Sequence, residues 1–461
     1  MKRWWSLARE AIRGSSEDFT SGPVDRAVVL LAVPMVLEMG MESLFAVVDV
    51  FFVSRLGAAA AATVGLTESM MAIVYTAAIG ISIGATAVVA RRFGEHDGDG
   101  AAEAAVQAIG LGVVVAVALG VVGAWQAEAL LRLMGATPGM VAEASGYTRV
   151  MLGCNLTVTL LFLTNAVFRG AGDAVIAMRM LWLSNAINIV LDPCLIFGLG
   201  PFPELGVTGA AVATNIGRGT AVATQLWVLG AGHARIRVAV RHLRLRATVM
   251  WNVCRLSGTG FLQVLIDTSS WIGLVRVIAA FGEEAMAGYT IGIRTVLFAV
   301  MPAWGLSNAA STMVGQALGA RKPERADEAV WTAGRLNLWF LGGLGVVFLV
   351  FARPIVAMFT ADPVVAGHAV ACLRIVSLGF PFFAYGLVLT QAFNGAGDAW
   401  TPTWLNLACF WVWQIPLAWW LALHLGLGPR GVYIAVTVAF STLAVLSGVL
   451  FRQGKWRLQR V

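Results

Sequence analysis

The chain has 461 residues, of which 59% are hydrophobic and only 12% are charged. Because a soluble domain carries about a quarter charged residues, this composition excludes an ordinary soluble enzyme, and the 23 Phe and 17 Trp exclude a disordered or fibrous chain. The formal net charge of +7 does not indicate a nucleic-acid partner, since the Lys and Arg residues of membrane proteins concentrate in cytoplasmic segments.

Apolar runs separated by Gly, Pro or charged residues predict an all-α polytopic membrane protein, because a bilayer-spanning helix needs about 20 mostly apolar residues. Residues 1–24 form a charged cytoplasmic segment that lacks the apolar core of a secretory signal peptide. Its Trp4, Trp5, Leu7 and Ile12 predict a short helix on the membrane surface. We place twelve spans near residues 28–53, 62–89, 104–124, 147–168, 177–199, 207–230, 253–280, 287–314, 331–352, 367–391, 403–425 and 431–451.

The charge distribution tests this arrangement of spans. An even number of spans puts both termini on one side of the membrane. Most Lys and Arg residues fall in the termini, in alternate connections and in the segment 231–251. Since cytoplasmic connections carry the excess of positive charge, both termini are predicted in the cytoplasm and the protein in the cell (inner) membrane.

The chain also repeats itself. The sequence from Phe168 to Ala174 recurs from Phe393 to Ala399, an offset of 225 residues, and Gly80–Glu103 parallels Gly305–Glu328 at the same offset. Repeated halves are a common design of transporters. We therefore expect two pseudo-symmetric six-helix lobes, with an N-lobe over 25–230, a basic cytoplasmic linker over 231–251, a C-lobe over 252–451 and a cytoplasmic tail over 452–461.

Polar residues inside the spans are the candidate functional residues, because a carboxylate at mid-membrane costs at least a few kcal/mol and usually faces an interior or a wet cavity. At 100° per residue, three acids of the first span share one face. The candidates are Glu38, Glu42 and Asp49 in the first span, Asn185, Asn188 and Asp192 in the fifth, and Gln263 and Asp267 in the seventh. Such acids can exchange a proton or bind Na⁺ with nearby oxygen ligands. The structural alternative is that some of them only pair with Arg218, Arg276 or Arg294.

Pro34 lies early in the first span. A proline inside a helix removes one hydrogen bond and clashes with the preceding turn, so it kinks the helix. The kink is either a hinge that moves when an acid changes its charge, or a static bend.

Two common enzyme motifs are absent from the sequence. It contains no G-x-x-x-x-G-K-[ST] and no H-E-x-x-H. The five Cys are far apart and include no C-x-x-C pair, which argues against a zinc site. We therefore expect no catalytic residues and no cofactor.

The sequence resembles the multidrug and toxic compound extrusion (MATE) family, with its DinF-like prokaryotic branch as the best match, from about residue 25 to 450. The resemblance rests on Pro34 with Val48-Asp49 and Arg55-Leu56-Gly57, on Asn188-Ile-Val-Leu-Asp192-Pro193, on Gly206-Val-Thr-Gly-Ala-Ala-Val-Ala-Thr214, and on the paired Phe-x-Gly-Ala-Gly-Asp segments. These segments occur in the family's order and at matching spacing.

This resemblance implies two six-helix lobes around a central cavity that opens alternately to the two faces of the membrane. It implies an antiporter that expels amphipathic, often cationic compounds (multidrug efflux) in exchange for inward H⁺ or Na⁺, and we expect a monomer. The ion-coupling residues carried over by motif, which are also the candidate Na⁺ ligands, are Asp49, Asn188, Asp192 and Thr214, with Thr208 as the alternative threonine. The bending proline maps onto Pro34, and an acid that another branch uses in the seventh span maps onto Asp267.

One departure from the family concerns the tenth span. The other branch has an aspartate there, whereas the matching stretch Phe380-Pro-Phe-Phe-Ala-Tyr385 has no acid, so coupling is expected in the N-lobe. Two other functions are open. A lipid-linked oligosaccharide flippase of the same superfamily would require a cationic cavity, and a membrane-embedded transferase would require a catalytic His or Asp pair.

Overall fold

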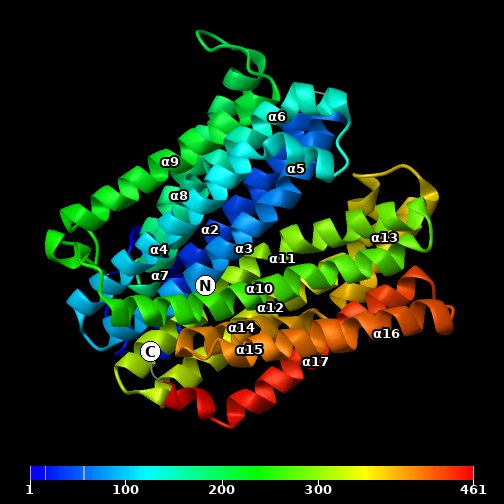
Figure 1. Ribbon diagram of the computed structural model, residues 1–461. Coiled ribbons are helices and arrows are strands. Elements are labelled where there is room, and N and C mark those ends of the chain that lie inside the picture. Colours follow the sequence, from blue (N-terminus) through cyan, green and yellow to red (C-terminus); the bar gives the residue numbers. More distant parts are fainter. Residues whose placement is uncertain (1, 16, 55–57, 460–461) are drawn as a thin grey trace. The chain divides into compact units, whose positions relative to one another are not determined.

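The computed structural model describes residues 2–15, 17–54 and 58–459, and these form helices joined by short connections, without a strand. Figure 1 shows the long helices, coloured along the chain. The first half contains α1 (Lys2–Arg13), α2 (Val24–Ser54), α3 (Ala58–Gly94), α4 (Gly98–Trp125), α5 (Ala127–Leu133), α6 (Pro138–Gly153), α7 (Asn155–Gly170), α8 (Ala174–Phe197) and α9 (Val207–Ala231). The second half contains α10 (Ala247–Ala279), α11 (Glu283–Gly319), α12 (Pro323–Ala357), α13 (Pro363–Ser377), α14 (Phe380–Ala396), α15 (Trp400–Asn406), α16 (Ile415–Trp419) and α17 (Pro429–Arg452).

The prediction of an all-α polytopic membrane protein is confirmed. Among the described residues, ten helices are long and apolar enough to span a membrane, and α13 with α14, bent by 60° at their junction, make an eleventh. The remaining long helix, α9, is not among these because it carries Arg218, Gln225 and several Thr residues. Both Arg218 and Gln225 are buried, so the polar face of α9 is covered by protein and the helix still fits the expected sixth span.

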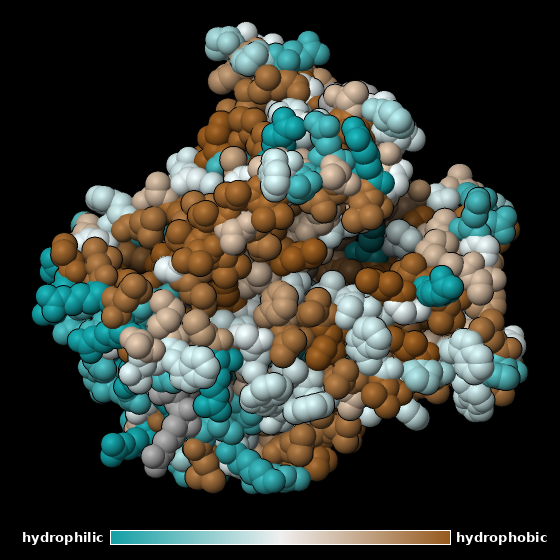
Figure 2. All heavy atoms as spheres, in the orientation of Figure 1, coloured by the Kyte–Doolittle hydropathy of each residue, from teal (hydrophilic) through white to brown (hydrophobic). Residues whose placement is uncertain are grey.

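The outer surface of the helices is as apolar as their interior. Large side chains such as Ile73, Val114 and Trp339 are more than half exposed. Figure 2 shows hydrophobic residues covering broad areas of the visible face, with hydrophilic residues gathered mostly near helix ends. Because water would disfavour such a surface, it is a surface for lipid.

The helix of the eleventh span is irregular. It runs from Trp400 to His424, and its segments Leu407–Gln414 and Trp420–His424 are π-helical. Pro416 lies between the two segments at the start of α16. Since proline has no N–H to donate to the preceding turn, a widened helix is a common way to rearrange the backbone bonds around it.

The chain divides into two compact units, and both divisions lie inside a helix. Apart from Ile12–Gly14, unit 1 takes the chain up to Val36 and from Leu262 onward, and unit 2 takes Leu37–Phe261. The first turns of α2 therefore belong with the second half, and the first turns of α10 belong with the first half. Leu37 and Leu262 are separated by the repeat offset of 225 residues, so the exchange of helix ends follows the internal repeat. This division into units differs from the predicted lobe boundaries at 25, 230 and 252, which assign most of α2 to the N-lobe and most of α10 to the C-lobe.

Paired glycines allow this exchange of helix ends. In unit 2, a Cβ atom on Gly80 of α3 would lie 2.5 Å from the backbone nitrogen of Phe261 in α10. In unit 1, a Cβ atom on Gly305 of α11 would lie 2.5 Å from the carbonyl oxygen of Met35 in α2. Gly80 and Gly305 are equivalent by the repeat, so both units use the same backbone-to-backbone approach.

The basic linker 231–251 lies against the connections of unit 2. It contains a short 3₁₀ turn, Val240–Leu243. Arg241 pairs with Asp99 at 2.7 Å, and Arg235 pairs with Asp173 at 3.3 Å. Burial raises the pKa of the Asp173 carboxyl above its ordinary value, although Arg235 opposes the shift. The linker is therefore a fixed part of unit 2.

The equivalent connection of unit 1 binds a different segment. His96 and Arg321 occupy equivalent turns, each with a φ of 58°. Four residues after the turn at Arg321, Arg325 donates hydrogen bonds of 2.7–2.8 Å to the carbonyl oxygens of Phe19, Ser21 and Gly22. The chain that leads into α2 is thereby fixed to the start of α12.

Candidate functional site

Close packing of α8 against α9 creates the candidate site in unit 2. A Cβ atom on Gly217 would lie 2.5 Å from the carbonyl oxygen of Ser184, and one on Gly209 would lie 2.4 Å from that of Leu195. Only glycine permits such an approach of two helix backbones. The polar side chains between these two contact points consequently face each other at short range.

Asn188, Asp192 and Thr214 form one hydrogen-bonded cluster between the two helices. With its amide oriented to suit both neighbours, Asn188 donates to Oδ2 of Asp192 at 2.8 Å and accepts from the hydroxyl of Thr214 at 2.8 Å and from its backbone N–H at 2.9 Å. The three residues are 2%, 0% and 7% exposed. A carboxylate, an amide oxygen and a hydroxyl are oxygen ligands that suit H⁺ or a hard cation such as Na⁺. The alternative threonine, Thr208, lies beside Gly146 of α6, and Thr214 is the one that reaches Asn188.

Glu42 connects α2 to the same face of α8. The amide of Asn185 donates to Oε2 of Glu42 at 3.4 Å, and Arg218 of α9 lies 3.8 Å from Oε1. Arg218 also donates to the hydroxyl of Tyr75 at 3.5 Å. Asn185 and Asn188 are one turn apart, so α2 and α9 both contact one polar face of α8.

Glu38 has a partner that the sequence analysis did not anticipate. One oxygen of its carboxylate accepts from Arg169 at 2.8 Å and from Asn165 at 3.0 Å, both on α7. Asn165 in turn accepts from Gln225 of α9 at 2.6 Å. Among the described residues, the second oxygen, Oε2, has no hydrogen-bond partner. Glu38 is 1% exposed, and it forms an ion pair with Arg169 within unit 2.

Two of the candidate acids do pair with arginines, and whether they have a further role stays open. Glu42 pairs with Arg218 as one of the suggested partners. Glu38 pairs with Arg169, which is not one of the suggested partners. The two sides of this pair are 131 residues apart, and no local pattern relates them.

Asp49 lies on α2, and its side chain is outside the described residues. The backbone register still places the residue. The indole of Trp182 donates to the carbonyl oxygen of Leu37, and Asn185 donates to Glu42, so α2 and α8 run in the same direction. Asp49 is seven residues beyond Glu42, and Asp192 is seven residues beyond Asn185. Both acids are thus at about the same level, two turns or about 10 Å beyond the Asn185–Glu42 contact.

Pro34, Gln263 and Asp267 belong to unit 1 and not to the cluster. Pro34 is inside α2, three residues before the division at Leu37. Gln263 and Asp267 lie on α10, and Gln263 is 6% exposed. Among the described residues, no hydrogen bond or ion pair joins their side chains to another group. The structure thus joins Asn188, Asp192 and Thr214 in one cluster and Asn185 with Glu42 in a second contact, and the seventh-span candidates belong to the other unit.

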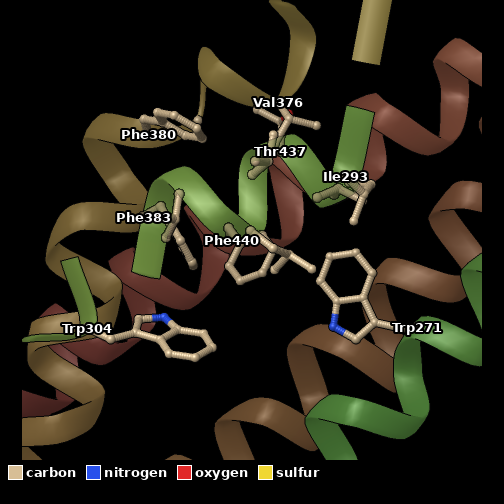
Figure 3. Close-up of a pocket in the computed structure, with 13 residues that line it drawn as sticks. Trp271, Ile293, Trp304, Val376, Phe380, Phe383, Thr437 and Phe440 are labelled. Atoms are coloured by element: carbon tan, nitrogen blue, oxygen red, sulfur yellow. The ribbon is translucent and has the colours of Figure 1, made fainter. Parts of the chain in front are cut away.

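The interior of unit 1 has an apolar pocket. It is lined by aromatic and aliphatic side chains from α10, α11, α13, α14 and α17, with Thr437 as its one polar side chain. Figure 3 shows Trp271 and Trp304 beside Phe383 and Phe440 around this space. Phe380 and Phe383, from the stretch without an acid, form part of its wall.

The sequence reasoning missed several members of the buried network, namely Tyr75, Asn165, Arg169 and Gln225. Asn165 and Gln225 are polar residues inside predicted spans, and this was the available signal. Arg169 is the variable residue of the Phe-x-Gly-Ala-Gly-Asp repeat, and the second copy has Asn394 there. A difference between two copies of a repeat is a signal that could have identified it.

Comparison with known proteins supports this architecture. The family profile described as MatE matches residues 34–194 and 261–420, once in each half of the repeat. A probable multidrug resistance protein NorM from Thermotoga maritima is 26% identical over 447 residues, covering 95% of this chain and 94% of that protein. The FAD transporter of Shewanella oneidensis is 26% identical over 401 residues, covering 86% and 88%.

A solved structure gives the same result at the level of the fold. It is that of a MOP superfamily transporter from Pyrococcus furiosus, with 25% identity, a TM-score of 0.90, and coverage of 98% of this chain and 99% of that chain. The matched family segments span more than half of the sequence, and the chain belongs to the MatE family of membrane transporters.

Proposed function

We propose that this transporter is a secondary active antiporter that exports amphipathic or cationic organic compounds and takes up H⁺ or Na⁺ in exchange. The observation that carries the proposal is the buried Asn188–Asp192–Thr214 cluster. A carboxylate with oxygen-bearing neighbours inside a membrane protein is costly to maintain, and such groups usually mark ion or proton pathways.

In the proposed cycle, Asp192 and Asp49 take up the ion, and Asn188 and Thr214 orient it. When the Asp192 carboxylate is neutralised, the hydrogen bonds between α8 and the neighbouring helices change. Glu42 links α2 to Asn185, so a rearrangement of α8 acts on the part of α2 beyond Leu37. We propose that α2 then bends at Pro34, and that the bend drives alternating access and expels the substrate.

The charge of the substrate is less constrained than the acids alone indicate. Glu38 and Glu42 are each paired with an arginine, so they contribute little net negative charge. The relative from Shewanella oneidensis is named as a transporter of FAD, which is an anionic dinucleotide. An anionic nucleotide-like substrate is therefore the second candidate, and the name of this relative is the observation that favours it.

The other two alternatives have less support. A lipid-linked oligosaccharide flippase would need unpaired cations, whereas Arg169 and Arg218 face glutamates. A membrane-embedded transferase would need a catalytic constellation. Membership of the DinF-like branch, a monomeric state, the inner membrane and cytoplasmic termini stay predictions.

Efflux from reconstituted vesicles tests the proposal. A fluorescent cationic dye is loaded, and its exit is followed under a pH gradient alone and under a Na⁺ gradient alone, with FAD added as a competitor in a parallel series. We expect one gradient to drive dye exit and Asp49→Asn to abolish it. Normal pumping by Asp49→Asn would contradict the mechanism, and competition by FAD would favour the anionic substrate.

Bending of α2 has its own test. Pro34→Ala restores the missing backbone hydrogen bond and straightens the helix, so we expect slower efflux with unchanged ion binding at the Asp192 cluster. Unchanged efflux in this variant would identify the bend as static.

A further inference from the structure

The outer face of unit 1 contains a groove that neither the cluster nor the apolar pocket uses. Its walls come from α14 and α17, with Phe382 and Leu389 on one side and Val445 and Val449 on the other. Phe382, Val445 and Val449 are each about half exposed. Gly448 adds no side chain, and a Cβ atom there would touch only Leu389 at 3.8 Å. The groove is therefore an open apolar channel between two membrane-spanning helices.

One end of this groove carries a fixed positive charge. The guanidinium of Arg452, the last residue of α17, lies 5.6 Å from the centre of the Trp331 ring. Trp331 is itself held by Tyr385 and Phe451, at ring distances of 6.0 and 6.1 Å. Stacking on an aromatic ring positions an arginine while leaving its N–H donors available.

Arg452 differs from nearby Arg457 in its ion pairing. Within the described part of the chain, no ion pair joins Arg452 to a carboxylate, whereas Arg457 pairs with Asp327 at 3.6 Å. The apolar span ends at Arg452, and we expect the polar headgroups of the lipids at the end of a span. The groove thus offers an apolar channel for a chain and a free cation where an anionic headgroup would lie.

We propose that this groove binds an anionic phospholipid, with one acyl chain along α14 and α17 and the phosphate on Arg452. The groove extends about 10 Å along the helix from Phe382 to Leu389, which is long enough to hold part of one acyl chain. Basic residues at the membrane end of a helix attract anionic lipids by about 1 kcal/mol each. This corresponds to a preference of about fivefold over a neutral lipid.

Native mass spectrometry of the purified full chain tests the proposal. Phosphatidylglycerol and phosphatidylcholine with identical acyl chains are added in equal amounts, and retained lipids are counted. We expect about fivefold preferential retention of phosphatidylglycerol, loss of the preference in Arg452→Gln, and its retention in Arg452→Lys. Arg430→Gln, at the other end of α17, is the matched control and should behave as the unchanged protein.

Two further measurements distinguish binding of the whole lipid from binding of its headgroup alone. Gly448→Leu fills the channel and should reduce retention of both lipids. Glycerol 3-phosphate, which has no acyl chain, should not be retained. Three results would each overturn the proposal. The first is an equal preference for phosphatidylglycerol in Arg452→Gln and the unchanged protein. The others are unchanged lipid retention in Gly448→Leu and retention of glycerol 3-phosphate.

Discussion

The two halves of the repeat share their backbone packing but differ in what they bury. Glu38 and Glu42 of the first half correspond to Gln263 and Asp267, and Arg169 corresponds to Asn394. At the position of Asp49 the second half has Leu274, which is fully buried in its core. The first half thus contains ion pairs and a polar cluster, where the second half contains an aromatic pocket.

This difference separates residues that the fold needs from residues that the function needs. Both halves keep a glycine at the helix exchange, Gly80 and Gly305, so close packing at this point belongs to the fold. The second half forms its core without the buried charges. Because buried ion pairs add little net stability compared with apolar residues of similar size, a fold of this kind does not require the polar network of the first half, and we propose that the network serves transport.

The largest expected effect comes from breaking a buried pair in the first half. Arg169→Ala leaves the Glu38 carboxylate buried without its cation, which we expect to cost about 3–5 kcal/mol. Glu38→Gln with Arg169→Met removes both charges and should recover most of this loss. The stability of both variants is measured as the midpoint of thermal unfolding in detergent. At the equivalent position of the second half, Asn394→Ala should cost about 1 kcal/mol, and an equal loss there would remove the distinction between the halves.

Glycine substitutions test what the halves have in common. Gly80→Ala and Gly305→Ala each force a Cβ atom against backbone, and we expect each to lower stability by about 1–3 kcal/mol. Gly342→Ala is the control, because nothing lies within 4 Å of its Cβ position. Alanine should there raise stability by up to about 1 kcal/mol through helix propensity. Destabilisation by only one of the two exchange variants would show that the halves pack differently.

Much of this fold could be predicted from the sequence, because apolar length and charge bias follow from the bilayer itself. The repeat of Phe168–Ala174 indicated two halves correctly. It did not indicate that the first turns of α2 and α10 exchange between units, since a helix that changes partner at Leu37 has no break in its sequence pattern.

The candidate site could be predicted in part. Asn188, Asp192 and Thr214 were identified by motif, and they are in contact. The pair of Glu38 with Arg169 could not be predicted, because its geometry depends on how α7 packs against α2. Charges far apart in sequence show no pairing until the helices are placed.

A smaller effect distinguishes the two threonines of α9. Thr214→Val removes the hydroxyl bonded to Asn188 while keeping its shape, which we expect to cost about 1 kcal/mol at the cluster and to slow efflux about fivefold. Thr208→Val should leave efflux unchanged. Dye efflux under the active gradient measures both variants, and an equal slowing would place the ion elsewhere.

The smallest expected effect concerns the linker of the first half. Arg241 and Asp99 are both mostly exposed, so Arg241→Ala should lower stability by at most about 1 kcal/mol. The loss should shrink further at high salt, because exposed charges are screened. Thermal unfolding at low and high ionic strength measures it, and a large salt-independent loss would mean that the linker carries more of the fold than its exposure indicates.

The most direct test of the central claim compares two acids inside the predicted spans, one in each half. Asp192→Asn and Asp267→Asn are reconstituted side by side, and dye efflux is measured under the gradient that drives the unchanged protein. If coupling lies in the first half, Asp192→Asn loses efflux and Asp267→Asn keeps most of it. Normal efflux by Asp192→Asn, or an equal loss in Asp267→Asn, would contradict this account.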